Sequence, residues 1–225
     1  MPILLTWFGA GCALVYLTQI ATGRPGEGHW QRSAAKTAAT LALVVAALVS
    51  PAPGLIVLGL ALGAAGDFFL SRHGQALFLA GMAAFAAGHL AYGAAFWSRA
   101  ATLGFSGPTF AQSLELVLLW LAIFALGFWL SSRAGALRLP VFGYALVIGL
   151  MASCALILPA QPGGRTLQLG VGLFVLSDTL LALRLFVTPG GAMQKPLDLV
   201  VWPAYWLGQA LIFAGAVIYW GFPTG

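Results

Sequence analysis

Long apolar runs separated by short polar turns dominate the chain. The runs are about 18 to 24 residues long, which suits helices that cross a bilayer, and they do not alternate as barrel strands do. We therefore expect an all-α integral membrane protein, a single domain built as a bundle of eight transmembrane helices. The predicted helices cover residues 3–21, 33–49, 54–70, 75–97, 110–130, 139–158, 166–187 and 197–220.

The composition agrees with this pattern. Of the 225 residues, 61% are hydrophobic and only 7% are charged, whereas soluble domains carry about 25% charged residues. The turns leave no room for a sizeable soluble domain, so any chemistry must take place in or at the membrane. Cys12 and Cys154 both lie inside predicted helices and are expected to be packing residues.

Basic residues are distributed unequally between the two ends of the predicted bundle. One end holds only Arg99 and Arg165, and the positive-inside rule places that end and both termini outside the cytoplasm. A bacterial inner membrane is the expected location. The net charge of +5 favours contact with anionic lipid headgroups, and no basic tract indicates nucleic acid. The opposite, cytoplasmic end holds Arg24, Arg32, Lys36, Arg72, Arg133, Arg138, Arg184 and Lys195.

Two aspartates interrupt the apolar helices. Asp67 lies near the end of the glycine-rich segment 54–70, and Asp178 lies within segment 166–187. A carboxylate inside a membrane is costly, so it is by default a candidate functional residue with a partner. Glycines share the helix face of Asp67, and small residues mark close helix contacts, so this side chain is expected to face the bundle interior.

Other polar residues are predicted on inward faces at the same end. Simpler roles remain open for them: Arg72 and Arg184 as ion-pair partners of the two aspartates, histidine, tyrosine and glutamine as hydrogen bonds between helices, and Lys36 as a surface anchor. The candidates for substrate binding or support are Lys36, Arg72, His89, Tyr92, Ser177, Tyr205 and Gln209.

A short internal similarity favours two parallel halves of four helices each. The stretch 66–70 resembles 177–181, and the following helix carries an aromatic residue and a glycine–polar pair in both cases, 85 with 88–89 and 205 with 208–209. Membrane folds with parallel repeats are known. Chance similarity in an apolar chain remains the alternative.

No sequence pattern indicates a metal or an organic cofactor. There is no H-E-x-x-H motif, no cysteine–histidine cluster and no phosphate loop. The segment nearest to a nucleophile elbow, 104–108, lacks the final glycine. Two carboxylates remain, which is the usual equipment of cofactor-independent acid–base hydrolysis.

The order and spacing of these residues resemble the YhhN family of lysoplasmalogenases, which are multispan membrane proteins. Lys36, Tyr144 and Met151 also match, although Thr37 stands where the family often has proline. The pattern is Gly66-Asp67-x-Phe69-Leu70, Phe78-x-x-Gly81-x-x-x-Phe85-x-x-x-His89-x-x-Tyr92, Gly172-x-Phe174-x-x-Ser177-Asp178 and Tyr205-x-x-x-Gln209.

This resemblance implies cleavage of the vinyl ether bond of a lysoplasmalogen, an alkenyl-glycerophosphoethanolamine or -choline. The products would be a fatty aldehyde and a glycerophospho-base, Asp67 and Asp178 would be the catalytic pair, and the partner would be a membrane lysolipid.

Vinyl ether hydrolysis needs one protonated and one ionised carboxyl group. The reaction begins with protonation at carbon, which gives an oxocarbenium ion that water then attacks. Glycosidases divide two carboxyl groups in the same way around a similar cation. We expect the deeper Asp178 to be the acid and Asp67, near Arg72, to be the base. Lys36, Arg72 and Arg184 would hold the lipid phosphate.

Two other functions fit the same residues. A proton-coupled transporter or lipid flippase also uses buried carboxylates and glycine-rich helices. A structural or lipid-binding protein would use the aspartates as packing pairs between helices.

Overall fold

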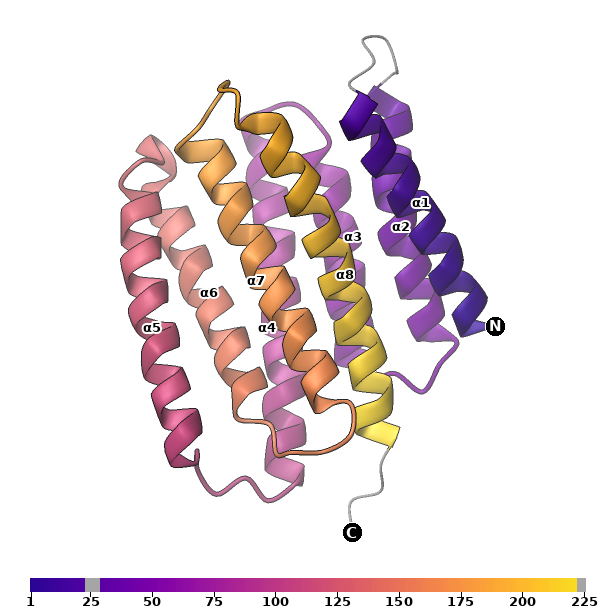
Figure 1. Ribbon diagram of the computed structural model, residues 1–225, viewed down its shortest axis with the longest axis vertical. Helices are drawn as coiled ribbons and strands as arrows, with labels where there is room; N and C mark the ends of the chain where they lie inside the picture. Colours follow the sequence, from indigo (N-terminus) through magenta and orange to yellow (C-terminus); the bar gives the residue numbers. More distant parts are fainter. Residues whose placement is uncertain (23–28, 222–225) are drawn as a thin grey trace.

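The computed structural model is all-helical in the residues that it describes, 1–22 and 29–221 (Figure 1). Those residues form eight α-helices and one short 3-10 helix: α1 (Pro2–Thr22), α2 (His29–Leu48), α3 (Gly54–Leu70), α4 (Gln75–Thr102), α5 (Phe110–Ser131), η1 (Gly135–Leu137), α6 (Arg138–Leu156), α7 (Gly164–Phe186) and α8 (Gln194–Gly221). The expected fold class is therefore confirmed as far as its helical content.

Two helices begin or end several residues away from the sequence prediction. Helix α4 continues to Thr102 instead of 97, because the chain reaches no helix-breaking residue before Gly104, whose φ is +74°. Helix α2 begins at His29 instead of 33, so Arg32 is part of the helix rather than of a loop.

Within residues 1–22 and 29–221, six helices are long and apolar enough to cross a membrane: α1, α4, α5, α6 together with η1, α7 and α8. Helix α3 is apolar but has only 17 residues, and α2 carries Arg32 and Lys36 among its first eight residues. These helices indicate an integral membrane protein, while the count of eight spans remains a prediction.

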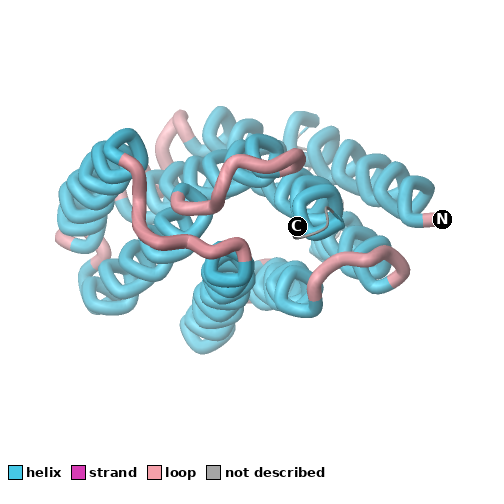
Figure 2. Tube along the Cα trace, turned by 90° about the horizontal axis from the view of Figure 1, so that it is seen from below, coloured by secondary structure: helices cyan, strands magenta, loops and turns pink. Residues whose placement is uncertain are grey.

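Consecutive helices pair as antiparallel hairpins: α1 with α2, α3 with α4, α5 with α6, and α7 with α8 (Figure 1). The turns between α3 and α4, between α5 and α6, and between α7 and α8 lie at one end of the bundle, at the top of Figure 1, which we call the basic end; α1 ends and α2 begins at the same end. Figure 2 views the other end, where loops connect one hairpin to the next and where α1 begins and α8 ends. Arg24 falls outside the described residues. The basic end holds Arg32, Lys36, Arg72, Arg133, Arg138, Arg184 and Lys195.

Glycines allow the helices of the two central hairpins to pack closely. A Cβ added at Gly88 of α4 would stand 3.2 Å from the carbonyl oxygen of Gly59 of α3. One added at Gly170 of α7 would stand 2.8 Å from the carbonyl oxygen of Gly208 of α8. Such close contacts are typical of small residues in membrane helices.

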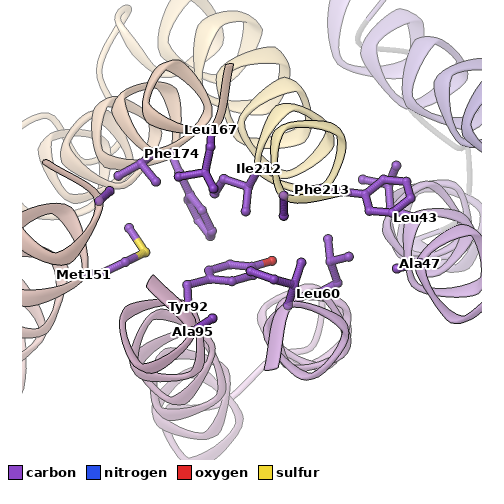
Figure 3. Packing of buried hydrophobic residues seen from close by; sticks show 14 of the residues in the cluster. Leu43, Ala47, Leu60, Tyr92, Ala95, Met151, Leu167, Phe174, Ile212 and Phe213 are labelled. Carbon is purple, nitrogen blue, oxygen red and sulfur yellow. The ribbon is translucent and has the colours of Figure 1, made fainter. Parts of the chain in front are cut away.

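Large side chains fill the space between the α3–α4 and α7–α8 hairpins. Figure 3 shows Tyr92 of α4 and Phe174 of α7 pointing toward each other in this layer, beside Leu60 and Ile212. The rings of Tyr92 and Phe174 meet edge to face, with centroids 6.5 Å apart. This layer separates the hairpins, and it leaves a cavity toward the basic end.

Candidate active site

A cavity of about 570 Å³ lies toward the basic end, lined by residues of α1, α2, α3, α4, α6, α7 and α8. Its volume is within the range of ligand pockets, about 300–1,000 Å³. Asp67 and Asp178 both line it, together with Ser177 and Tyr205. Much of the remaining wall is apolar and includes Leu70, Phe78, Met82, Phe85, Leu181 and Phe186. The fold thus brings two aspartates that are far apart in sequence, one on α3 and one on α7, to the same cavity.

The carboxylate of Asp67 is completely buried and is held by three donors. Lys36 Nζ lies 2.9 Å from Oδ1. The hydroxyl groups of Thr40 and Tyr205 donate to Oδ2, at 2.7 and 2.9 Å. Lys36 and Thr40 are one helical turn apart and therefore share a face of α2. Because an ammonium group can only donate, these surroundings match an ionised carboxylate.

Asp178 has a different environment, because its nitrogen partner is a histidine, whereas that of Asp67 is a lysine. Nε2 of His89 lies 2.9 Å from Oδ2, and the hydroxyl group of Tyr144 donates to the same oxygen at 2.9 Å. The second ring nitrogen of His89 faces Met151, with 3.2 Å between Nδ1 and Sδ. His89 is completely buried. An imidazole and a carboxyl group in this contact can carry a shared proton on either partner.

Aromatic rings connect the surroundings of the two aspartates. The ring centroid of Tyr205, which binds Asp67, lies 5.3 Å from that of Phe174. The Phe174 centroid in turn lies 4.6 Å from that of His89, which binds Asp178. Each carboxylate therefore has its own donors, and the ring of Phe174 packs between a donor to Asp67, Tyr205, and the partner of Asp178, His89.

Tyr92 and Gln209, which we expected to bind substrate or support the site, lie behind Tyr205. The hydroxyl group of Tyr92 donates to Oε1 of Gln209 at 2.5 Å, and Nε2 of Gln209 donates to the hydroxyl oxygen of Tyr205 at 3.4 Å. This chain orients the Tyr205 hydroxyl group toward Asp67. Ser177 lines the cavity and donates to the carbonyl oxygen of Val201 at 3.1 Å, which ties α7 to α8.

Neither catalytic candidate, Asp67 or Asp178, forms an ion pair with the arginine that follows it closely in sequence. The partner of Asp67 is Lys36 rather than Arg72, whose guanidinium group lies over the Phe68 ring, 4.6 Å from its centroid. Arg184 pairs with Asp198, not with Asp178. Both short-range pairings considered from the sequence are therefore wrong, because the actual partners come from other helices.

The sequence pattern does not single out two further residues, Thr40, which binds Asp67, and Asp198, which lines the cavity. Thr40 was recognisable as the residue one turn after Lys36 on the same helix face. Asp198 is one of only five acidic residues in the chain, and this scarcity in an apolar sequence was a signal to examine it. Tyr144 and Met151 were noted only through the family resemblance, and the structure places both against His89.

The sequence profile of the YhhN family matches residues 31–216. The chain belongs to the YhhN family. The matched range contains Lys36, Asp67, His89, Asp178 and Tyr205, so the site described above lies within it. No curated protein matches the chain, and no solved structure matches it either.

Proposed function

We propose that this YhhN protein hydrolyses the vinyl ether bond of a lysoplasmalogen within the membrane, releasing a fatty aldehyde and a glycerophospho-base. One observation carries the proposal: Asp67, bound to lysine, and Asp178, bound to histidine, line a single cavity whose wall is largely apolar. Membership of the YhhN family is consistent with this activity.

Asp178, hydrogen-bonded to His89, is the proposed general acid. Its proton moves to the vinyl carbon that is not bonded to oxygen, which produces an oxocarbenium ion and leaves Asp178 ionised. His89 and Tyr144 hold the carboxyl group, each through a contact of 2.9 Å to Oδ2. General acid catalysis of this kind contributes about 10²–10⁴ to a rate.

Asp67 is the proposed base and counter-charge. Its carboxylate stabilises the oxocarbenium ion and accepts a proton from the water that attacks the cationic carbon. The resulting hemiacetal collapses to the aldehyde and the glycerol alcohol. The proton then returns from Asp67 to Asp178, which restores the starting state. Lys36 holds Asp67 ionised before each turnover, through the contact of 2.9 Å.

The lining of the cavity suits the two ends of a lysolipid. Phe78, Met82 and Leu181 offer apolar contacts for the alkenyl chain. Arg32 and Lys195 lie at the basic end, where a phosphate would meet positive charge. By the positive-inside rule this end faces the cytoplasm, so the substrate would enter from the inner leaflet.

The proposal is tested by incubating the purified protein with an alkenyl-lysophosphatidylethanolamine in deuterated water and analysing the products by mass spectrometry. We expect a fatty aldehyde that carries deuterium at the carbon next to the carbonyl group, because protonation takes place there. Asp67→Asn and Asp178→Asn should each lower its release by at least about a hundredfold. The matched control is Glu115→Gln, a carboxylate exposed on α5, which should retain full activity.

Full activity in either aspartate variant would refute the proposed roles. Sealed vesicles address the transport alternative. If the protein takes up lipid in response to a proton gradient and releases no aldehyde, proton-coupled transport replaces hydrolysis as its function.

A further inference from the structure

Four charged side chains at the basic end of the cavity take no part in the proposed proton transfers. We call them the mouth cluster: Arg32 of α2, Arg184 of α7, and Lys195 and Asp198 of α8. The cluster contains three cations and one carboxylate. It therefore offers sites for an anion and, beside them, one site for a cation.

Arg184 and Asp198 form a side-on ion pair that keeps binding capacity for further groups. Nε of Arg184 lies 2.5 Å from Oδ1 of Asp198, and Nη2 lies 3.1 Å from Oδ2. This contact uses one edge of the guanidinium group and leaves Nη1 available, while each carboxylate oxygen keeps a further lone pair. Both side chains remain accessible, at 27% and 30% exposure. An anion and an ammonium group can thus bind side by side without breaking the pair.

Arg32 and Lys195 add positive charge to the anion side. Nη2 of Arg32 donates to the carbonyl oxygen of Gln19 at 3.4 Å. Its Nε is buried and has no hydrogen-bond acceptor within the described part of the chain. A buried donor without an acceptor costs free energy, so an entering oxyanion that accepts this hydrogen bond would be favoured. Lys195 is exposed and can move onto the same ligand.

We infer that the mouth cluster is a subsite for a phosphoethanolamine headgroup. Arg32, Arg184 and Lys195 take the phosphate, and Asp198 takes the primary ammonium group. The inference rests on the proposed function, because it names the headgroup of the same lysolipid substrate.

The kind of cation follows from the side chains around the mouth. A primary ammonium group has N–H donors for the carboxylate of Asp198, whereas a trimethylammonium group has none and is bound by aromatic cages. One aromatic pair that lines the cavity is Tyr16 with Trp202, whose ring centroids are 4.7 Å apart. Lys36 already occupies the face of Trp202, with Nζ 5.8 Å from the ring centroid. The site therefore favours ethanolamine over choline.

The spacing along the helices agrees with this assignment. Asp198 and Tyr205 are seven residues apart on α8, a rise of about 10 Å, and Asp178 and Arg184 are six residues apart on α7, a rise of about 9 Å. A headgroup at the mouth cluster would thus leave its glycerol unit to extend toward the two catalytic carboxylates.

Headgroup binding is tested separately from catalysis with ester-linked lysolipids, which have no vinyl ether bond to cleave. Lysophosphatidylethanolamine, lysophosphatidylcholine and lysophosphatidic acid with one common acyl chain are titrated into the full-length protein in detergent by calorimetry. We expect the wild type to bind the ethanolamine lipid about tenfold more tightly than the other two, the effect of one charged hydrogen bond.

Variants of the mouth cluster distinguish binding of the ammonium group by Asp198 from binding of the phosphate by the cations. Asp198→Asn should remove the preference for ethanolamine, and Asp198→Glu should retain it. Lys195→Gln should weaken all three lipids to a similar extent. Glu115→Gln, which alters a carboxylate outside the cavity, should change none of these affinities. The measured quantity is the ratio of the affinities for different lipids. A variant that is merely less well folded would bind all of them less and would leave this ratio unchanged.

Equal wild-type affinities, or an ethanolamine preference that survives in Asp198→Asn, would overturn the inference. Glycerophosphoethanolamine, which has no tail, should bind at least about a hundredfold more weakly, since it buries no hydrocarbon chain. Equal binding of this soluble compound would assign the subsite to free phosphoamines instead. Ethanolamine selectivity without aldehyde release would refute the hydrolysis alone, and aldehyde release without selectivity would refute the subsite alone.

Discussion

Lys36 of α2 and Asp67 of α3 form an ion pair in which Nζ lies 2.9 Å from Oδ1 and the Asp67 side chain is only 1% exposed. The pair joins an ammonium group about two turns into α2 to a carboxylate near the end of α3. Each buried charge is stabilised by the other, because an ion without a partner of opposite charge costs free energy to hold away from water.

We expect Lys36→Met to lower the free energy of unfolding by about 3–5 kcal/mol, since it leaves the Asp67 charge buried without its partner. Thermal unfolding in detergent measures the loss. The double variant Lys36→Met/Asp67→Asn should regain most of this stability, because no charge remains buried. A double variant that is as unstable as the single one would mean that lysine acts through packing instead.

Tyr144→Phe tests the hydroxyl group that donates to Asp178. Removal of one hydrogen bond to the carboxylate that forms as Asp178 gives up its proton is expected to lower kcat on lysoplasmalogen about tenfold or more. Asp178→Asn should lower it by about 10²–10⁴. The matched control is Tyr219→Phe, which deletes a hydroxyl group that donates to the carbonyl oxygen of Pro159. Similar kcat losses in both tyrosine variants would argue against a specific role of Tyr144.

Two glycines of α7 provide a paired test of helix packing. A Cβ at Gly170 would stand 2.6 Å from the backbone nitrogen of Ile212, whereas a Cβ at Gly172 meets nothing within 4 Å. Gly170→Ala should therefore destabilise the protein by about 1–3 kcal/mol, because backbone atoms of α8 cannot move aside easily. Gly172→Ala should change stability by less than about 0.5 kcal/mol. Equal unfolding midpoints in detergent would contradict the close α7–α8 contact.

Tyr92 and Gln209 are expected to be energetically coupled. Tyr92→Phe leaves Oε1 of Gln209 buried without its donor and should cost about 1–3 kcal/mol. Combined with Gln209→Leu, the same change should cost less than the sum of the two single losses, because both polar partners are then gone. Unfolding of all four proteins of this cycle gives the coupling energy. Simple additivity would show that the hydrogen bond contributes nothing.

The orientation in the membrane can be tested by cysteine labelling. On a background in which Cys12 and Cys154 are replaced by alanine, Lys195→Cys should react with an impermeant maleimide only from the cytoplasmic side. Ala160→Cys, in an exposed loop at the opposite end, should react only from the other side. The reverse pattern would invert the proposed topology and place the cavity mouth outside.

The helices could be predicted from the sequence because their signal is local. Apolar runs of sufficient length and the turns between them lie within each segment, and the residues that the structure describes contain a helix for each predicted one. The cost of a carboxylate in a membrane likewise identified Asp67 and Asp178 without any knowledge of their neighbours.

Only the folded chain decided which groups those aspartates meet. The donors to Asp67 include Thr40 and Tyr205, which lie 27 and 138 residues away in sequence, and the imidazole at Asp178 comes from 89 residues away. Nearby arginines were plausible partners, but a side chain within a helix turns toward the neighbouring helices that pack against its face. Periodicity describes one helix at a time, so pairings between helices, and the cavity they enclose, depend on how the hairpins pack together.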